Sequence, residues 1–133
     1  MSFVLDVSVT ATWAFPDENH LRADAALARL RNDHGLVPSL WWFEIRNVLV
    51  ISERRNRLTE ADTAAFLRDL EKLRIVHDLA PDHAELLRLA RTHRLTVYDA
   101  AYLELAQRNG VPLATLDDAL IRAAQAESVP ILN

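Results

Sequence analysis

The stretch Phe3-Val4-Leu5-Asp6 begins with three apolar residues and stops at a carboxylate. An apolar run this short is typical of a strand that is buried on both faces of a sheet. The acid that follows it then lies at the carboxyl end of the strand. Four similar runs occur further along the chain, so we expect about five strands in all, at residues 3–5, 36–37, 75–76, 112–114 and 130–132.

Stretches with the apolar period of an α-helix separate these runs. Thr59 with Asp62 three residues later is a capping signal, and Asn109-Gly110 predicts the end of a helix before a strand. Strands that alternate with helices imply an α/β fold with a parallel sheet. Two consecutive helices have no strand between them and should form a helical hairpin beside the sheet, where a partner could dock. The expected helices cover residues 21–30, 40–52, 61–73, 84–90, 100–106 and 119–126.

The composition fits a single domain that spans residues 1–133. Half of the residues are hydrophobic, which suffices for one core, while 133 residues are too few for two domains. The sequence has no cysteine, which excludes disulfides, thiolate zinc sites and a cysteine nucleophile. Asp6 interrupts the first apolar stretch, so this stretch cannot act as a signal peptide, and no later segment is long enough to cross a membrane. We therefore expect a soluble, cytoplasmic protein with no membrane partner.

The net charge of −4 argues against a protein that grips nucleic acid through a globally basic surface. A local basic patch remains open, because Arg46, Arg54, Arg55 and Arg57 lie close together in the sequence and arginine suits bidentate phosphate contacts. The alternative is a solvated helix face, since Arg54 and Arg55 also stand where the C-terminus of a helix favours positive charge.

Three aspartates follow or end elements of the predicted sheet. Asp6 and Asp117 come after predicted strands, and Asp99 opens the helix that follows the extended segment Leu95-Thr96-Val97. Ligands of open parallel sheets gather at the carboxyl ends of the strands, so these side chains should converge. Each one alone could instead be a helix N-cap, for which aspartate is favoured. The three together favour a shared site.

Glu44 stands among apolar neighbours, where an ionised carboxylate without a partner is costly. Arg46 could neutralise it, or a metal ion could. Clustered carboxylates repel one another by roughly 3 kcal/mol per pair at ~5 Å with an effective dielectric near 20, so a cluster of acids needs a compensating charge. Carboxylate oxygens are ligands that suit Mg²⁺ or Mn²⁺.

Three aromatic residues in succession, Trp41, Trp42 and Phe43, begin one of the two hairpin helices. Neighbours on a helix point about 100° apart, so at least one of the three should be partly exposed. We expect this surface to be a homodimer face. The alternative is that another part of the same chain covers it.

Four short motifs, each carrying one of the four acids, occur in order along the chain. The motifs are Val4-Leu5-Asp6-Val7-Ser8-Val9, Glu44-Ile45-Arg46-Asn47-Val48-Leu49, Tyr98-Asp99-Ala100-Ala101-Tyr102 and Leu113-Ala114-Thr115-Leu116-Asp117. Together they closely resemble the motif series of PIN domains, specifically VapC-type toxins, over essentially the whole sequence. The resemblance implies a three-layer α/β/α fold with a mostly parallel sheet. It also implies a metal-dependent endoribonuclease acting on transfer RNA or other structured RNA, a VapB-like antitoxin partner and a homodimer.

The resemblance also assigns roles to individual residues. It implies that Asp6, Asp99 and Asp117 bind Mg²⁺ or Mn²⁺, and that Glu44 holds a second metal ion or a bound water. Asp118 could share or compete for the role of Asp117. The residues expected to orient these acids are Ser8, Thr115 and, with a weaker signal, Asn47, and those expected to face RNA are Arg46, Arg54 and Arg55.

Two other classes of protein fit some of these observations. A receiver-like signalling domain also binds Mg²⁺ at strand ends, but it needs an acidic pair after the first strand and a lysine after the last. Here Val7 follows Asp6, and Lys72 is the single lysine. A catalytically inert PIN-like module that only binds a partner would account for the exposed aromatics, but it does not require acids at all four positions. The histidines lack the His-Glu-x-x-His spacing of a zinc hydrolase.

Overall fold

Strands and helices alternate along the chain in the computed structural model, which describes residues 1–133. The strands are β1 (Ser2–Leu5), β2 (His34–Pro38), β3 (Ile75–Asp78) and β4 (Leu113–Ala114). The helices are α1 (Val7–Thr12), α2 (Leu21–Arg29), α3 (Leu40–Arg54), α4 (Glu60–Glu71), α5 (His83–His93), α6 (Val97–Asn109) and α7 (Asp118–Ala126).

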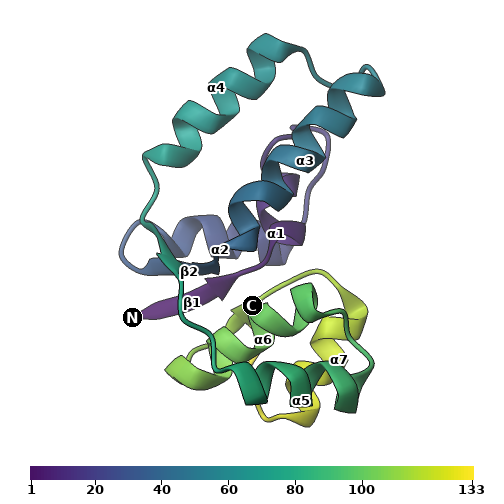
Figure 1. Cartoon of the computed structure of the whole chain (residues 1–133). Coiled ribbons are helices and arrows are strands. Elements are labelled where there is room, and N and C mark those ends of the chain that lie inside the picture. The colour runs from purple at the N-terminus through teal and green to yellow at the C-terminus, as the bar shows by residue number, and fades with distance from the viewer.

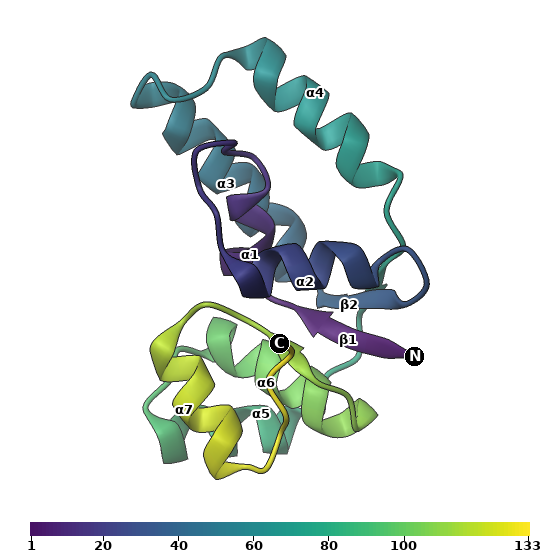
Figure 2. The same cartoon turned by 180° about the vertical axis from the view of Figure 1, so that it is seen from behind.

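The four strands form one parallel sheet in the order β3-β2-β1-β4. Helix α2 lies on one side of this sheet, and α5, α6 and α7 lie on the other (Figures 1 and 2). The predicted α/β fold with a parallel sheet is therefore confirmed. Strands β1 and β4 lie side by side, with Leu5 opposite Ala114 in register, so the segments that leave them start next to each other.

The central strand is buried on both faces, as its continuous apolar sequence predicts. Phe3, Val4 and Leu5 have no exposed surface. Helix α6 supplies much of the cover, since every residue from Ala100 to Ala106 is buried. Gly110 ends this helix in the left-handed conformation, at φ 63°, which confirms the predicted C-cap.

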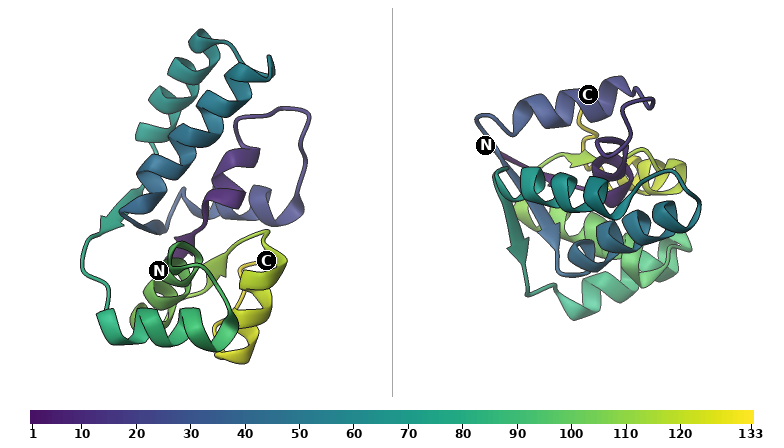
Figure 3. Two further views of the ribbon diagram at one scale, coloured as in Figure 1. Left: turned by 45° about the vertical axis from the view of Figure 1, so that its right-hand side comes forward. Right: turned by 90° about the horizontal axis from the view of Figure 1, so that it is seen from above.

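Helices α3 and α4 form the predicted hairpin, which projects from one end of the sheet (Figure 3, left). The Thr59 side chain and Asp62 form a reciprocal capping box at the start of α4. Of the three aromatics that begin α3, Trp41 is buried, while Trp42 and Phe43 are 43% and 69% exposed. The prediction that at least one would be exposed is confirmed.

The elements of the structure differ from the expected ones by one strand fewer and one helix more. The expected fifth strand is reduced to a single bridge between Ile131 and Leu113, because Pro130 has no backbone N–H to donate to a ladder. Helix α1 was not predicted, since four of its six residues are β-branched and favour strands. Its buried side chains show that packing determines this helix.

No helix combines the length and the apolar character that crossing a membrane requires.

Candidate active site

Asp6 lies directly after β1, at the carboxyl end of the sheet. It is 3% exposed and occupies the N-cap position of α1, but its side chain makes no capping hydrogen bond. The capping alternative therefore does not explain this residue. Its carboxylate instead accepts hydrogen bonds from two hydroxyl groups, Ser8 Oγ at 2.6 Å and Thr115 Oγ1 at 2.7 Å.

Both hydrogen bonds fall on the same carboxylate oxygen, Asp6 Oδ2. The hydroxyl groups are themselves held by the backbone that follows β4. Leu116 N donates to Ser8 Oγ at 2.9 Å, and Asp117 N donates to Thr115 Oγ1 at 3.1 Å. No buried side-chain oxygen in the protein lacks a hydrogen-bond partner, so the second Asp6 oxygen, Oδ1, must reach solvent. Asp6 thus presents one oxygen that is fixed and one that is available.

Asp117 is the N-cap of α7, and here the capping explanation does apply. Its Oδ1 accepts a hydrogen bond from Leu120 N at 2.9 Å, while Oδ2 accepts none. The side chain is partly exposed. Asp118, the alternative in the sequence, is exposed on the first turn of α7 and makes no hydrogen bond to this network.

Asp99 does not open its helix, contrary to the sequence prediction. Helix α6 begins at Val97, and the cap is Thr96, whose Oγ1 accepts a hydrogen bond from Asp99 N at 3.0 Å. The sequence Leu95-Thr96-Val97 was interpreted as an extended segment before the helix. In the structure only Leu95 and Thr96 lie between the turn that ends α5 and the first residue of α6. Asp99 is therefore in the first turn of α6, with its partly exposed carboxylate not used as a cap.

Glu44 reaches the same region from the second turn of α3. It is partly buried, and Tyr102 OH donates to its Oε1 at 2.5 Å, leaving Oε2 without a partner. Arg46 does not neutralise it. The Arg46 guanidinium instead stacks 3.7 Å from the centre of the Trp42 ring and donates to the Trp42 carbonyl oxygen.

The four acids act on one another electrostatically. Burial raises the pKa of the Asp6 carboxyl, the hydrogen bonds from Ser8 and Thr115 oppose the rise, and the charges of Asp99 and Asp117 add to it. Burial also raises the pKa of Asp99, and Asp117 raises it further.

Glu44 shows the same pattern. Burial raises the pKa of its carboxyl, the hydrogen bond from Tyr102 opposes the rise, and the charges of Asp6 and Asp99 add to it. The repulsion between these acids shows that they share one electrostatic environment.

None of the four acids forms an ion pair with Arg, Lys or His. A buried carboxylate elsewhere in the protein shows the contrast. Glu104 is 2% exposed and pairs with Arg108 at 2.7 Å, and Arg108 also pairs with Asp78. The fold neutralises this acid with an arginine but leaves the cluster at the sheet edge without a positive charge.

The chemistry of the cluster fits a hard divalent cation. It offers carboxylate oxygens only, which Mg²⁺ and Mn²⁺ prefer, and Asp6, Glu44 and Asp117 each keep one oxygen free of hydrogen bonds. No three of the His, Asp and Glu side chains are close enough to coordinate an ion directly as they stand. Mg²⁺ typically keeps several of its waters, and carboxylates can also act on the ion through these waters.

Several predicted site residues lie outside this network. Asn47 is exposed and makes no hydrogen bond to Glu44. Arg54 and Arg55 are exposed at the end of α3 and form no ion pair within the chain. Sequence reasoning in turn gave Tyr102 no role. Its signal was its spacing three residues after Asp99, which places both side chains on one face of α6.

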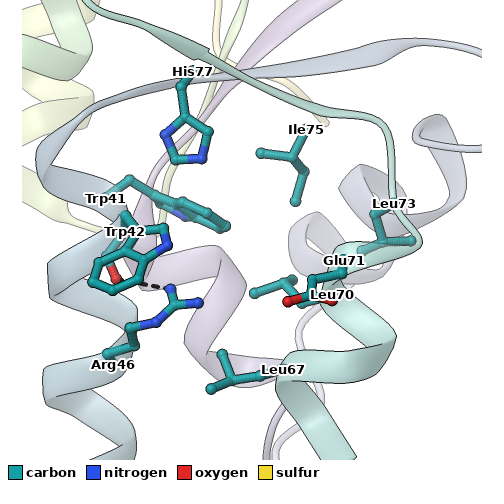
Figure 4. A pocket seen from close by; sticks show the side chains of 9 residues that line it. All are labelled: Trp41, Trp42, Arg46, Leu67, Leu70, Glu71, Leu73, Ile75 and His77. Carbon is teal, nitrogen blue, oxygen red and sulfur yellow. Dashed lines mark hydrogen bonds between the residues drawn. The ribbon is translucent and has the colours of Figure 1, made fainter.

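A separate pocket of about 240 Å³ lies between α3, α4 and β3 and contains none of the four acids (Figure 4). Trp41 and Trp42 line one side of it, and the opposite side comes from α4 and the segment leading into β3. Arg46 and Glu71 bring opposite charges to the pocket. Its lining residues are Trp41, Trp42, Arg46, Leu67, Leu70, Glu71, Leu73, Ile75 and His77.

The parallel sheet and the acids at its carboxyl edge define an α/β/α protein with an acidic, oxygen-donor site. Comparison with known proteins is in agreement, because the PIN domain family model matches residues 3–126. The chain belongs to the PIN domain family. It is 35% identical over 135 residues to Ribonuclease VapC3 of Pyrobaculum aerophilum, covering 99% of this chain and 98% of that protein. The resemblance to VapC-type PIN domains is thereby confirmed.

Two solved structures share the fold. PAE2754 from Pyrobaculum aerophilum matches with a TM-score of 0.70 and 25% identity, covering 92% of this chain and 79% of that one. FitAcB from Neisseria gonorrhoeae matches with a TM-score of 0.58 and 20% identity, covering 98% of this chain and 96% of that one. The second likeness concerns the fold alone.

Proposed function

We propose that this protein is a VapC-type endoribonuclease, the toxin of a toxin–antitoxin pair, which hydrolyses phosphodiester bonds of RNA with Mg²⁺ or Mn²⁺. The observation that carries this proposal is the cluster of four carboxylates at the sheet edge that no arginine, lysine or histidine neutralises. The similarity to Ribonuclease VapC3 supports the same activity. The receiver-like alternative loses its basis, since the chain is a PIN domain.

The four acids have two parts in the proposed reaction. Asp6, Asp99 and Asp117 would hold the cation, and Ser8 and Thr115 fix the orientation of Asp6. Glu44 would use its free oxygen, Oε2, to hold a second cation or a bound water. When bound, a divalent cation supplies activation of water and stabilisation of charge on the phosphate.

The substrate is proposed to be transfer RNA or another structured RNA in the cytoplasm, with residues 1–133 acting as one domain. Arg54 and Arg55 are the candidate phosphate contacts, because they are exposed and unpaired on the hairpin helix that also carries Glu44. Arg46 is a weaker candidate, since its guanidinium is already stacked on Trp42.

Cleavage of a total-RNA pool tests the activity. The purified protein should give discrete products with Mg²⁺ or Mn²⁺, none with EDTA, and about 100-fold less product when Asp99 is replaced by Asn. Asp24→Asn, an exposed aspartate on α2, is the matched control and should cleave normally. If folded, metal-loaded protein cleaves no RNA, the inert binding module becomes the better interpretation.

The proposed protein partners are a VapB-like antitoxin and a second copy of the chain. The apolar pocket between α3 and α4 is the candidate antitoxin site, because it exposes indole and leucine side chains beside an arginine and a glutamate (Figure 4). The proposed homodimer face is then reduced to the exposed side of α3 around Phe43, which lies outside the pocket. We expect Leu67→Ala to weaken antitoxin binding by about 10-fold, through loss of roughly 1–2 kcal/mol of apolar contact, without changing RNA cleavage.

Leu79→Ala is the matched control for the partner site, since Leu79 is 77% exposed and outside the pocket. Titration calorimetry with the cognate antitoxin measures both affinities, and equal affinities for the two variants would place the antitoxin elsewhere. Light scattering of the free toxin tests the homodimer, which a monomeric mass at all concentrations would exclude.

A further inference from the structure

Tyr102 is fully buried in α6, and its hydroxyl points at Glu44. The ring belongs to the hydrophobic core, so apolar packing accounts for its position but not for its oxygen. A phenylalanine would fill nearly the same space. The hydroxyl therefore needs a functional explanation, and the side chain to which it donates is Glu44, through Oε1 at 2.5 Å.

The hydrogen bond connects two helices that both contribute acids. Helix α3 carries Glu44, and α6 carries Asp99 one turn before Tyr102. Helix α6 is held firmly, because its residues from Ala100 to Ala106 are buried beneath the sheet (Figure 1). A rigid helix that supplies one acid thus also sets the position of the acid on its neighbour.

In three of the four acids, one carboxylate oxygen accepts hydrogen bonds and the other accepts none. Hydroxyl groups hold Oδ2 of Asp6, a backbone amide holds Oδ1 of Asp117, and the Tyr102 phenol holds Oε1 of Glu44. In each case the other oxygen is free. All of these donors are neutral, so they orient the carboxylates without cancelling the charge that would attract a cation. An arginine in place of Tyr102 would orient Glu44 but also neutralise it.

We propose that Tyr102 is a positioning residue of the active site, which holds Glu44 through one oxygen so that the other faces the cation or its water. This inference rests on the proposed metal-dependent cleavage. It concerns one hydroxyl group and predicts that the effects of Tyr102 depend entirely on the presence of Glu44.

Tyr102→Phe is the direct test, because it removes one oxygen and keeps the ring. We expect the affinity for Mn²⁺, measured by calorimetry, to fall about 10-fold, and kcat for RNA cleavage to fall by a similar factor with KM little changed. Tyr98→Phe is the matched control. Tyr98 lies on the same helix but is 64% exposed and makes no hydrogen bond through its hydroxyl, so neither quantity should change.

A double-mutant cycle separates positioning from a general packing role. In a Glu44→Ala background, Tyr102→Phe should leave Mn²⁺ affinity and residual cleavage unchanged, because the group that it positions is gone. A further 10-fold loss in that background would overturn the proposal. So would a Tyr102→Phe variant that binds Mn²⁺ and cleaves RNA as the wild type does. Wild-type protein that binds no Mn²⁺ would instead contradict the proposed function itself.

Discussion

Replacement of Asp6 by Asn is expected to reduce RNA cleavage by about 100-fold or more, since even groups that only orient a metal ligand contribute about 10- to 100-fold. The same change should leave the metal-free protein at least as stable as the wild type. Burial raises the pKa of Asp6, so the ionised carboxylate lowers the free energy of unfolding at neutral pH. Asparagine removes this charge and keeps an oxygen that can accept hydrogen bonds from Ser8 and Thr115.

Thermal unfolding in EDTA, beside the cleavage assay, checks both parts of this prediction. The expected combination is a melting temperature equal to or above that of the wild type together with almost no cleavage. Asp24→Asn serves again as the control, with both properties unchanged. A marked fall in melting temperature for Asp6→Asn would mean that the carboxylate stabilises the fold, which would contradict its assignment as an uncompensated ligand.

Addition of Mn²⁺ should stabilise the protein strongly at neutral pH and little in acid. At a Mn²⁺ concentration of 100 times Kd the expected gain is about 2.7 kcal/mol, which corresponds to roughly 5–15 °C in melting temperature. The pKa values of Asp6, Glu44 and Asp99 are raised in the folded protein. Their ionised forms therefore cost stability at high pH, and this cost disappears as the pH falls through the folded pKa values.

The stabilisation by Mn²⁺ increases with pH, because Mn²⁺ binds only the ionised carboxylates. Melting temperatures with Mn²⁺ and with EDTA, compared between about pH 5 and pH 8, should thus converge on the acid side. Acids with lowered pKa values, such as Asp33 and Glu127, lie outside the cluster. They affect the melting temperature equally with Mn²⁺ and with EDTA, so they do not change the difference between the two. A gain that is equal at every pH, or that persists in Asp6→Asn, would show that Mn²⁺ binds elsewhere.

Much of the fold could be predicted from short local signals. A buried parallel strand needs apolar residues on both faces, and Phe3-Val4-Leu5 shows this without ambiguity. Capping signals such as Thr59 with Asp62 act within four residues, so the sequence contains all the information that they need. Helix α1 could not be predicted, because its β-branched residues favour a strand. Packing of its buried side chains makes it helical.

The site was less predictable, because side-chain partners depend on segments far apart in the chain. The position of Asp6 after a strand could be inferred from sequence, but its hydrogen bond to Thr115 spans 109 residues. Arg46 seemed a natural partner for Glu44 at a separation of two residues. Residues two apart on a helix do not face each other. In the structure Arg46 stacks on Trp42, and Glu44 accepts a hydrogen bond from Tyr102. Packing in three dimensions determines these side-chain partners, and proximity in the sequence does not.

The pairing of β1 with β4 has a consequence for the synthesis of the protein. The first strand and Asp6 leave the ribosome before the strand beside them and the hydroxyl group of Thr115, which follows Asp6 by 109 residues. Domains form from the N-terminus as the chain emerges, and a contact across 109 residues cannot form before its second half exists. A chain that has not yet reached Thr115 therefore holds no assembled acidic site. For an enzyme proposed to attack RNA, this order of strands delays assembly of the acidic site until Thr115 has been synthesised.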